Sequence, residues 1–268
     1  MTETELILTS IRNCRRVELY VDPRPLNSFQ QNRFEEFKNR RQNNEPLQYI
    51  LGSCEFMDIP LKVDERVLIP RPETEILVET VLQIFQREKA KAEPLKILDL
   101  GVGSGNISIA LAKHIKECLV TAVDFSQGCL DLAVLNAKMN FVQNKIQFIQ
   151  SDLFSAFQLK EFREPFDIIV SNPPYIPRHE MDSLSSEVRF EPREALDGGV
   201  DGLDFYRRIF QECPAFLKPE GFLVVEIGAD QFKALERLLD SFPQLKILEV
   251  KKDLCQRDRV LVVQFHKK

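Results

Sequence analysis

From residue 95 onward, short apolar runs alternate with longer segments in which apolar residues recur every three or four positions. The short runs have the length of buried strands, and the longer segments have the periodicity of helices. Such alternation predicts an α/β fold, in which a mostly parallel sheet is covered by helices on both faces. The expected strands are 95–100, 119–124, 146–150, 166–171, 221–227, 245–250 and 259–265, and the expected helices begin near residues 74, 106, 126, 202 and 231.

The first part of the chain has a different pattern. Residues 1–46 show helical spacing with little β-branched alternation, which predicts a small helical domain. Residues 47–69 contain short apolar segments, the first at 49–51, which we interpret as strands of a β-hairpin linker. The third domain then covers 70–268, where Pro70 and Pro72 impose an extended entry and Thr74 is expected to cap the first helix.

Composition narrows the class of protein. The net charge of −5 argues against a surface built for tight, non-specific nucleic-acid binding, and we expect no stable nucleic-acid partner. The six cysteines are scattered without a CxxC pair, which indicates free thiols in a reducing compartment and no metal site. The N-terminus is polar, and no apolar run approaches membrane-spanning length. We therefore expect a soluble, cytoplasmic protein without a membrane partner, acting as a monomer.

The most distinctive candidate chemistry follows the predicted strand 166–171, where Asn172, Pro173, Pro174 and Tyr175 stand in succession. The prolines stiffen this segment, Asn172 offers an amide oxygen, and Tyr175 offers a flat ring with a polar tip. Two acceptors and a flat face suit a planar amino group. In isolation, an ordinary Asn-Pro turn explains these four residues equally well.

Three successive strand ends also carry candidate binding residues. A glycine-rich loop at 101–105 lies between a strand and a helix, where backbone N–H groups and a close approach are available to a ligand. Its spacing is G-x-G-x-G rather than the G-x-G-x-x-G of dinucleotide oxidoreductases. Asp124 ends the next strand, where a carboxylate can accept both ribose hydroxyl protons, and Asp152 follows the third. Each acid could instead cap a turn.

Together these residues resemble the class I S-adenosylmethionine-dependent methyltransferases, and most closely the HemK/PrmC family of protein-(glutamine-N5) methyltransferases. The likeness covers most of the chain from Tyr49 onward. It is carried by the segments 49–52, 68–75, 99–105, 171–175, 191–192, 195–196, 198–203 and 226–228. The Asn-Pro-Pro-Tyr element also occurs in amino-directed DNA and RNA methyltransferases, whereas its combination with the Pro-Arg-Pro-Glu-Thr-Glu segment is specific to this family.

The resemblance implies a Rossmann-like, seven-stranded sheet and methyl transfer from S-adenosylmethionine, leaving S-adenosylhomocysteine. The acceptor would be the side-chain nitrogen of the glutamine in the GGQ motif of class I peptide chain release factors, whose recognition would fall to the helical domain. Leu153 departs from relatives that carry an aromatic residue there. The implied cofactor contacts are Gly101, Val102, Gly103, Ser104, Gly105, Asp124, Asp152, Leu153 and Asn172; the implied catalytic residues are Asn172, Pro173 and Tyr175; and Asn172, Pro173, Pro174 and Tyr175 would hold the substrate.

Three other functions remain open from the sequence. An amino-directed DNA or RNA methyltransferase would use the same four residues on a nucleobase, but usually needs a basic groove and a device that extracts the base. A sister enzyme would methylate glutamine in a ribosomal protein. A catalytically silent adaptor on the same fold would not need the intact glycine loop, Asp124 and Asn172. The long loop at 175–200 is too long for a mere connector and is expected to be functional. Its part 178–199 could cover the substrate, and a solvated loop explains its charged residues equally well.

Overall fold

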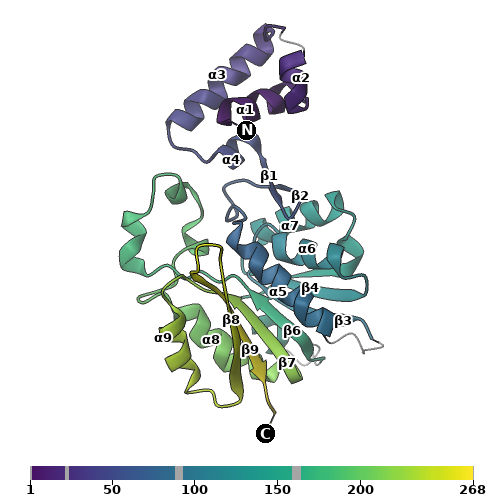
Figure 1. Ribbon diagram of the computed structural model, residues 1–268, viewed down its shortest axis with the longest axis vertical. Helices are drawn as coiled ribbons and strands as arrows, with labels where there is room; N and C mark the ends of the chain where they lie inside the picture. Colours follow the sequence, from purple (N-terminus) through teal and green to yellow (C-terminus); the bar gives the residue numbers. More distant parts are fainter. Residues whose placement is uncertain (1, 22–23, 88–92, 159–163, 268) are drawn as a thin grey trace.

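The computed structural model describes residues 2–21, 24–87, 93–158 and 164–267. A small helical unit lies at one end of the molecule, and a hairpin joins it to a larger body built around one sheet (Figure 1). No helix within those ranges is both long and apolar enough to cross a bilayer.

The predicted α/β fold is confirmed, with seven strands in the order β5-β4-β3-β6-β7-β9-β8. Strands β5, β4, β3, β6 and β7 are parallel to one another, and β9 pairs antiparallel with both β7 and β8. The strand expected at 221–227 begins earlier, at Leu217. Its first residues were not predicted because Pro219 and Gly221 interrupt the apolar pattern. The bounds are β3 Leu95–Leu100, β4 Cys118–Asp124, β5 Ile146–Gln150, β6 Phe166–Ser171, β7 Leu217–Glu226, β8 Leu245–Lys252 and β9 Asp258–Phe265.

This strand order places a ligand crevice between β3 and β6. The chain runs from β3 outward to β4 and β5, then returns to lay β6 on the other side of β3. At such a reversal the loops after the two strands diverge, and a crevice opens beyond their carboxyl ends. The glycine loop follows β3 and Asn172 follows β6, so both lie at this reversal.

Helices cover both faces of the sheet. One apolar cluster joins α5 (Glu73–Arg87), α6 (Asn106–His114) and α7 (Gln127–Met139) to one face, and a second joins α8 (Asp204–Glu212) and α9 (Phe232–Leu239) to the other. Along β3, Ile97 belongs to the first cluster while Leu98 and Leu100 belong to the second, as expected for a strand buried on both faces. Short 3₁₀ turns lie at Gln143–Lys145, Ser155–Gln158 and Cys213–Ala215.

The N-terminal residues form the expected helices, α1 (Glu3–Arg12), α2 (Arg16–Val21) and α3 (Ser28–Gln42). Their separate core contains Ile7, Phe37, Leu47 and Ile50. Capping boxes fix the starts of two of these helices, from Thr2 with Glu5 and from Asn27 with Gln30.

The linker differs in part from its prediction. Residues Leu47–Leu51 form a short helix, α4, rather than a strand, between Pro46 at its N-cap and the left-handed Gly52 at its C-cap. The hairpin follows as β1 (Ser53–Phe56) and β2 (Ile59–Lys62). Its two turn residues, Met57 and Asp58, have φ of 49° and 60°, so the turn is of the tight primed type. Residues 67–69 are not a strand.

The long segment 175–200 leaves the sheet and returns to the same place. The main chains of Ile176, Leu196 and Gly198 are hydrogen-bonded, with Ile176 donating to the Leu196 carbonyl at 3.0 Å. Between these ends lie 3₁₀ turns at Arg178–Ser183, Val188–Phe190 and Arg193–Ala195. A loop whose ends meet is a compact excursion, which here extends toward the helical domain (Figure 1).

Candidate active site

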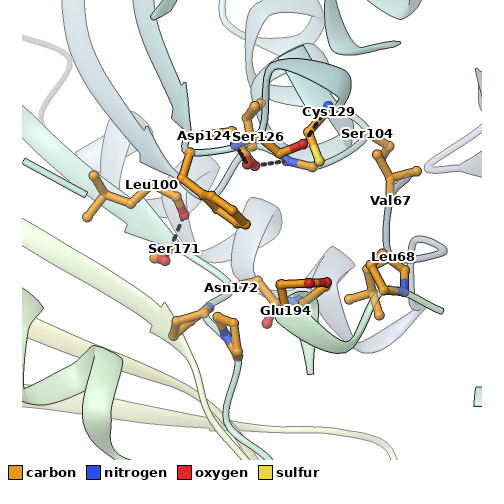
Figure 2. Close-up of a pocket in the computed structure, with 18 of the residues that line it drawn as sticks. Val67, Leu68, Leu100, Ser104, Asp124, Ser126, Cys129, Ser171, Asn172 and Glu194 are labelled. Atoms are coloured by element: carbon orange, nitrogen blue, oxygen red, sulfur yellow. Dashed lines mark hydrogen bonds between the residues drawn. The ribbon is translucent and has the colours of Figure 1, made fainter. Parts of the chain in front are cut away.

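A cavity of about 420 Å³ opens beyond the carboxyl ends of β3 to β6. This volume is within the usual range for a small-molecule site. Figure 2 shows Asp124 and Asn172 on opposite sides of it, with Val67 and Leu68 of the linker closing a third side. Segments from the linker, the glycine loop, three further strand ends and the long loop therefore share one space.

The glycine loop supplies one wall of the cavity. Gly101 and Gly103 have φ of 78° and 51°, which favour glycine, and a Cβ on either would meet no atom within 4 Å. That open space lets a ligand lie against the main chain. Gly105 is different, because it does not line the cavity. A Cβ there would approach Ile109 Cδ1 at 3.0 Å, so this glycine serves helix packing, and its cofactor contact stays a prediction.

Asp124 holds the glycine loop and faces the cavity. Its carboxylate accepts from the backbone N–H of Gly103 at 3.0 Å and of Ser126 at 2.9 Å. Burial raises the pKa of Asp124, and the backbone N–H groups of Gly103 and Ser126 oppose that rise. A carboxylate offers about four acceptor positions, so positions remain for ligand hydroxyl groups.

Asp99, which begins the glycine-loop motif, lies beneath the cavity rather than in it. It is fully buried and accepts from the hydroxyl of Ser108 at 2.5 Å, while its Oδ1 has no hydrogen-bond partner. Burial raises the pKa of Asp99 to about 7. Its contact with α6 makes it a support for the loop.

Asp152 and Leu153 also line the cavity. The Asp152 side chain is 58% exposed and pairs with Arg208 at 2.9 Å, so any ligand that used this carboxylate would share it with an arginine. Leu153 is buried and has a φ of 48°, which is unusual for a non-glycine residue. Their adenine contacts stay predictions.

The segment after β6 is anchored on both sides of Asn172. The Ser171 hydroxyl donates to the Leu100 carbonyl at 2.8 Å, which ties this strand end to β3. Asn172, Pro173 and Pro174 then line the cavity. A Cβ on Gly198 would lie 2.7 Å from Tyr175 Cα, so the glycine-rich end of the long loop lets the two main chains pack closely.

Thr74 does not cap α5 as predicted, because it lies inside the first turn of that helix. Its side chain is buried, and its hydroxyl donates to Glu226 Oε2 at 2.6 Å at the end of β7. The same hydroxyl oxygen accepts from Asn172 Nδ2 at 3.2 Å. The first turn of α5 therefore provides a hydrogen-bond acceptor for the Asn172 side chain.

Tyr175 turns away from the cavity. It does not line that space, and its ring packs against the core beneath α8 and α9. Its hydroxyl lies 3.4 Å from Glu226 Oε1, and burial raises its pKa. The expectation that this ring stacks on a substrate amide stays a prediction, since the ring here packs against protein.

The long loop reaches the cavity through Pro192, Glu194 and Ala195. Glu191 fixes this approach: its side chain is 2% exposed, accepts from the backbone N–H of Ile69 at 3.0 Å and pairs with Arg71. Burial raises the pKa of Glu191, which Arg71 opposes. Of the two charged residues on the proline-rich entry, Arg71 lines the cavity, whereas Glu73 does not.

Comparisons with known proteins place this chain in a family. A Methyltransferase small domain model matches residues 73–199, and a PrmC N-terminal domain model matches residues 1–52. A protein from Thermodesulfovibrio yellowstonii named release factor glutamine methyltransferase is 38% identical over 98% of this chain and 91% of its own length. One of the same name from Rhodopirellula baltica is 36% identical over 98% and 88%. The chain belongs to the release factor glutamine methyltransferase family.

Solved structures agree on the fold of this family member. The ribosomal protein L11 methylase of Lactobacillus delbrueckii subsp. bulgaricus superposes with a TM-score of 0.54 at 19% identity, covering 77% of this chain and 86% of that one. The hMettl16 catalytic domain superposes with a TM-score of 0.60 at 15% identity, covering 78% and 76%. At such identities the likeness concerns the methyltransferase fold alone.

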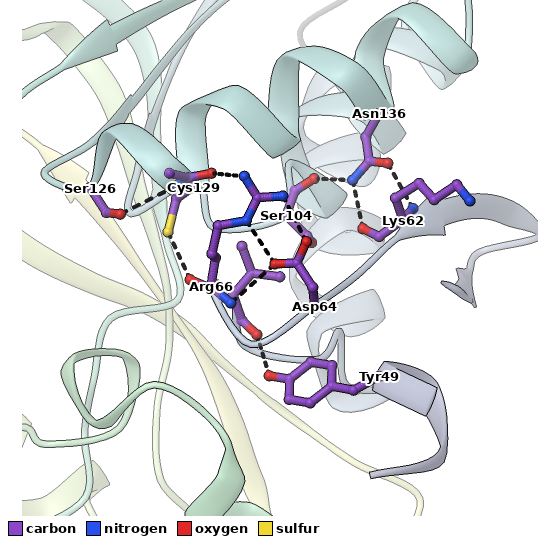
Figure 3. A network of polar contacts seen from close by, with 10 residues as sticks. Tyr49, Lys62, Asp64, Arg66, Ser104, Ser126, Cys129 and Asn136 are labelled. Carbon is purple, nitrogen blue, oxygen red and sulfur yellow. Dashed lines mark hydrogen bonds and ion pairs between the residues drawn. The ribbon is translucent and has the colours of Figure 1, made fainter. Parts of the chain in front are cut away.

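In this family member, the linker is part of the cavity wall, which the sequence did not indicate. Figure 3 shows its polar contacts with α7. Asn136 is fully buried and bonds both main-chain groups of Lys62, at 2.7 and 2.9 Å. The Tyr49 hydroxyl donates to the Val67 carbonyl at 2.6 Å, and Cys129 Sγ donates to the Arg66 carbonyl. These bonds fix the segment 65–68, which lines the cavity.

Proposed function

We propose that this chain transfers the methyl group of S-adenosylmethionine to the side-chain amide nitrogen of the glutamine in the GGQ motif of class I peptide chain release factors. The observation that carries this proposal is the pairing of the Asn172–Pro173 acceptors with the glycine loop and Asp124 across one cavity. Family membership and the match of residues 1–52 to the PrmC N-terminal domain support the substrate class.

The cavity fits the cofactor by its chemistry. Gly101 and Gly103 leave room against the main chain for a flat, extended molecule, and Asp124 has acceptor positions for ribose hydroxyl groups. S-adenosylmethionine supplies a methyl group activated by its sulfonium. Leu153 offers an apolar surface for the base.

The acceptor end would act by position and electrostatics. An amide nitrogen is a poor nucleophile, because its lone pair is delocalised into the carbonyl. We propose that Asn172 Oδ1 and the Pro173 carbonyl each accept one N–H of the glutamine amide and aim its lone pair at the methyl group. As the nitrogen attacks, it becomes positive and its protons become more acidic. Both hydrogen bonds then strengthen in the transition state, which accelerates the reaction.

The decisive experiment offers three acceptors to the full-length protein with radiolabelled S-adenosylmethionine. Purified release factor should take up label, and a factor whose GGQ glutamine is replaced by alanine should not. Label transferred instead to nucleic acid or to ribosomal protein would overturn the proposed substrate. Label in none of the three would overturn the proposed activity.

A further inference from the structure

Three side chains from distant parts of the sequence form a hydrogen-bonded chain behind Asn172. Asn172 Nδ2 donates to Thr74 Oγ1 at 3.2 Å, and the Thr74 hydroxyl donates to Glu226 Oε2 at 2.6 Å. Thr74 and Glu226 are each 1% exposed. Water cannot replace a hydrogen-bond partner of either side chain, so the Thr74 hydroxyl and the Glu226 carboxylate depend on the hydrogen bonds among these three residues.

The chemistry of the three groups fixes the direction of these bonds. An ionised carboxylate only accepts, so the single hydroxyl proton of Thr74 goes to Glu226. The Thr74 oxygen can then only accept from Asn172, which must present its nitrogen to Thr74. Because the two ends of an amide are of similar shape, this contact decides which end faces the cavity.

We propose that Thr74 and Glu226 are positioning residues that hold the Asn172 amide with its oxygen toward the acceptor nitrogen. This inference rests on the proposed function, since it assigns Asn172 Oδ1 as the acceptor of a substrate N–H. Glu226 does not line the cavity, so it acts only through Thr74 and the Tyr175 hydroxyl.

Glu226 is enclosed by groups from several elements. The charge of Arg259 in β9 lowers the pKa of Glu226, and that of Glu73 in α5 raises it. The Tyr175 hydroxyl lies 3.4 Å from Glu226 Oε1, and the Tyr206 hydroxyl of α8 donates to the Glu226 main-chain carbonyl at 2.7 Å. Burial raises the pKa of Glu226 to about 7, opposed by the Thr74 hydrogen bond and Arg259.

Protonation of Glu226 would reverse the direction of donation in the hydrogen bonds between Glu226, Thr74 and Asn172. A protonated carboxyl can donate to Thr74, whose hydroxyl then donates to Asn172. Asn172 would accept that bond through its oxygen and turn its nitrogen toward the cavity, where it cannot accept from a substrate N–H. Turnover should therefore fall as the pH drops through about 7 and Glu226 becomes protonated.

The first test compares Thr74→Val with Thr74→Ser in the full-length protein. Valine keeps the shape of threonine but removes the hydroxyl, so kcat should fall about tenfold to a hundredfold, as for other groups that orient a catalytic side chain. The KM for release factor and the Kd for S-adenosylmethionine should stay within about twofold, and serine should restore most of kcat.

Thr80→Val is the matched control. Thr80 is a buried threonine of the same helix, and its hydroxyl donates to the Ile76 carbonyl rather than to Glu226. Its replacement should leave kcat unchanged. Wild-type kcat in Thr74→Val, or an equal loss in both valine variants, would overturn the inference, and thermal melting shows that the variants are folded.

The second test compares pH profiles of wild type and Glu226→Gln. Glutamine keeps the volume but cannot titrate, so the loss of kcat below about pH 7 should disappear along with part of the activity. The same acid limb in both proteins would show that Glu226 does not govern it, and would overturn its role.

A readout that needs no acceptor separates this inference from the proposed function. In NMR spectra, a side-chain NH₂ proton of Asn172 should carry the shift of a hydrogen bond in wild type and lose it in Thr74→Val. Unchanged amide resonances would overturn the positioning role. If the wild-type protein methylated no release factor while the resonances still moved, the substrate assignment would fail and the hydrogen-bonded chain would stand.

Discussion

The two ends of the cavity are built in different ways. At the glycine loop, binding groups come from the main chain of a short contiguous segment, and Asp124 braces it by accepting from the backbone N–H of Gly103. At the acceptor end, the working group is one side-chain amide, and its orientation depends on Thr74 and Glu226, which are 152 positions apart. A cradle of main chain tolerates the loss of a single contact better than an end that depends on one oriented amide.

Replacement of Asn172 by alanine should have the largest effect on the acceptor end. Loss of one preorganised acceptor aimed at the reacting nitrogen should lower kcat about a hundredfold to a thousandfold. Calorimetry should find the cofactor Kd nearly unchanged, because the glycine loop and Asp124 remain. Near-normal turnover in this variant would remove Asn172 from the mechanism.

Replacement of Asp124 by alanine should have the next largest effect, at the opposite end. Loss of the charged acceptor and of the brace on Gly103 should raise the Kd for S-adenosylmethionine about tenfold to a hundredfold. Asp131→Ala, which removes an acid from the exposed face of α7, is the control and should leave the Kd unchanged. Equal affinities in the two variants would exclude a ribose contact at Asp124.

Removal of residues 1–45 should act on neither end directly. The helical unit has its own core, and Arg41 links it to the long loop by pairing with Glu187 at 2.7 Å. We expect the KM for intact release factor to rise about tenfold. A short glutamine peptide should be methylated as before. If the intact factor were methylated normally, the proposed recognition role of residues 1–46 would be wrong.

Glu191→Gln should have the smallest effect, about twofold to fivefold. It removes the charge that pairs with Arg71 while keeping the shape of the side chain and an oxygen that can accept from the Ile69 N–H, so the loop that brings Pro192 to the cavity should be held less firmly. Steady-state kinetics should show a raised KM with little change in kcat. Arg178→Gln, at the exposed Arg178–Asp197 pair, is the control.

The fold and the placement of the glycine loop and Asp124 at one cavity were predictable because their signals are local. Buried strands read as apolar runs, and the glycine loop and Asp124 each stand at a strand end. Helix α4 was missed because its apolar run is as short as a strand, although Pro46 before it and Gly52 after it are typical helix brackets. The hydrogen bond from Thr74 to Glu226 could not be predicted from the sequence, since only tertiary packing brings those residues together. The local pattern around Thr74 indicated a helix cap instead.

The shared wall formed by residues 65–68 limits how this chain can be recombined. Tyr49 of α4 holds that wall through Val67, while Leu47 and Ile50 of the same helix belong to the core of the helical unit. A graft that replaced everything before β3, in order to change which release factor is recognised, would therefore also remove one side of the cavity. The usable splice lies in the turn between α3 and α4, at residues 43–46, with a new partner surface shaped to cover Leu47 and Ile50.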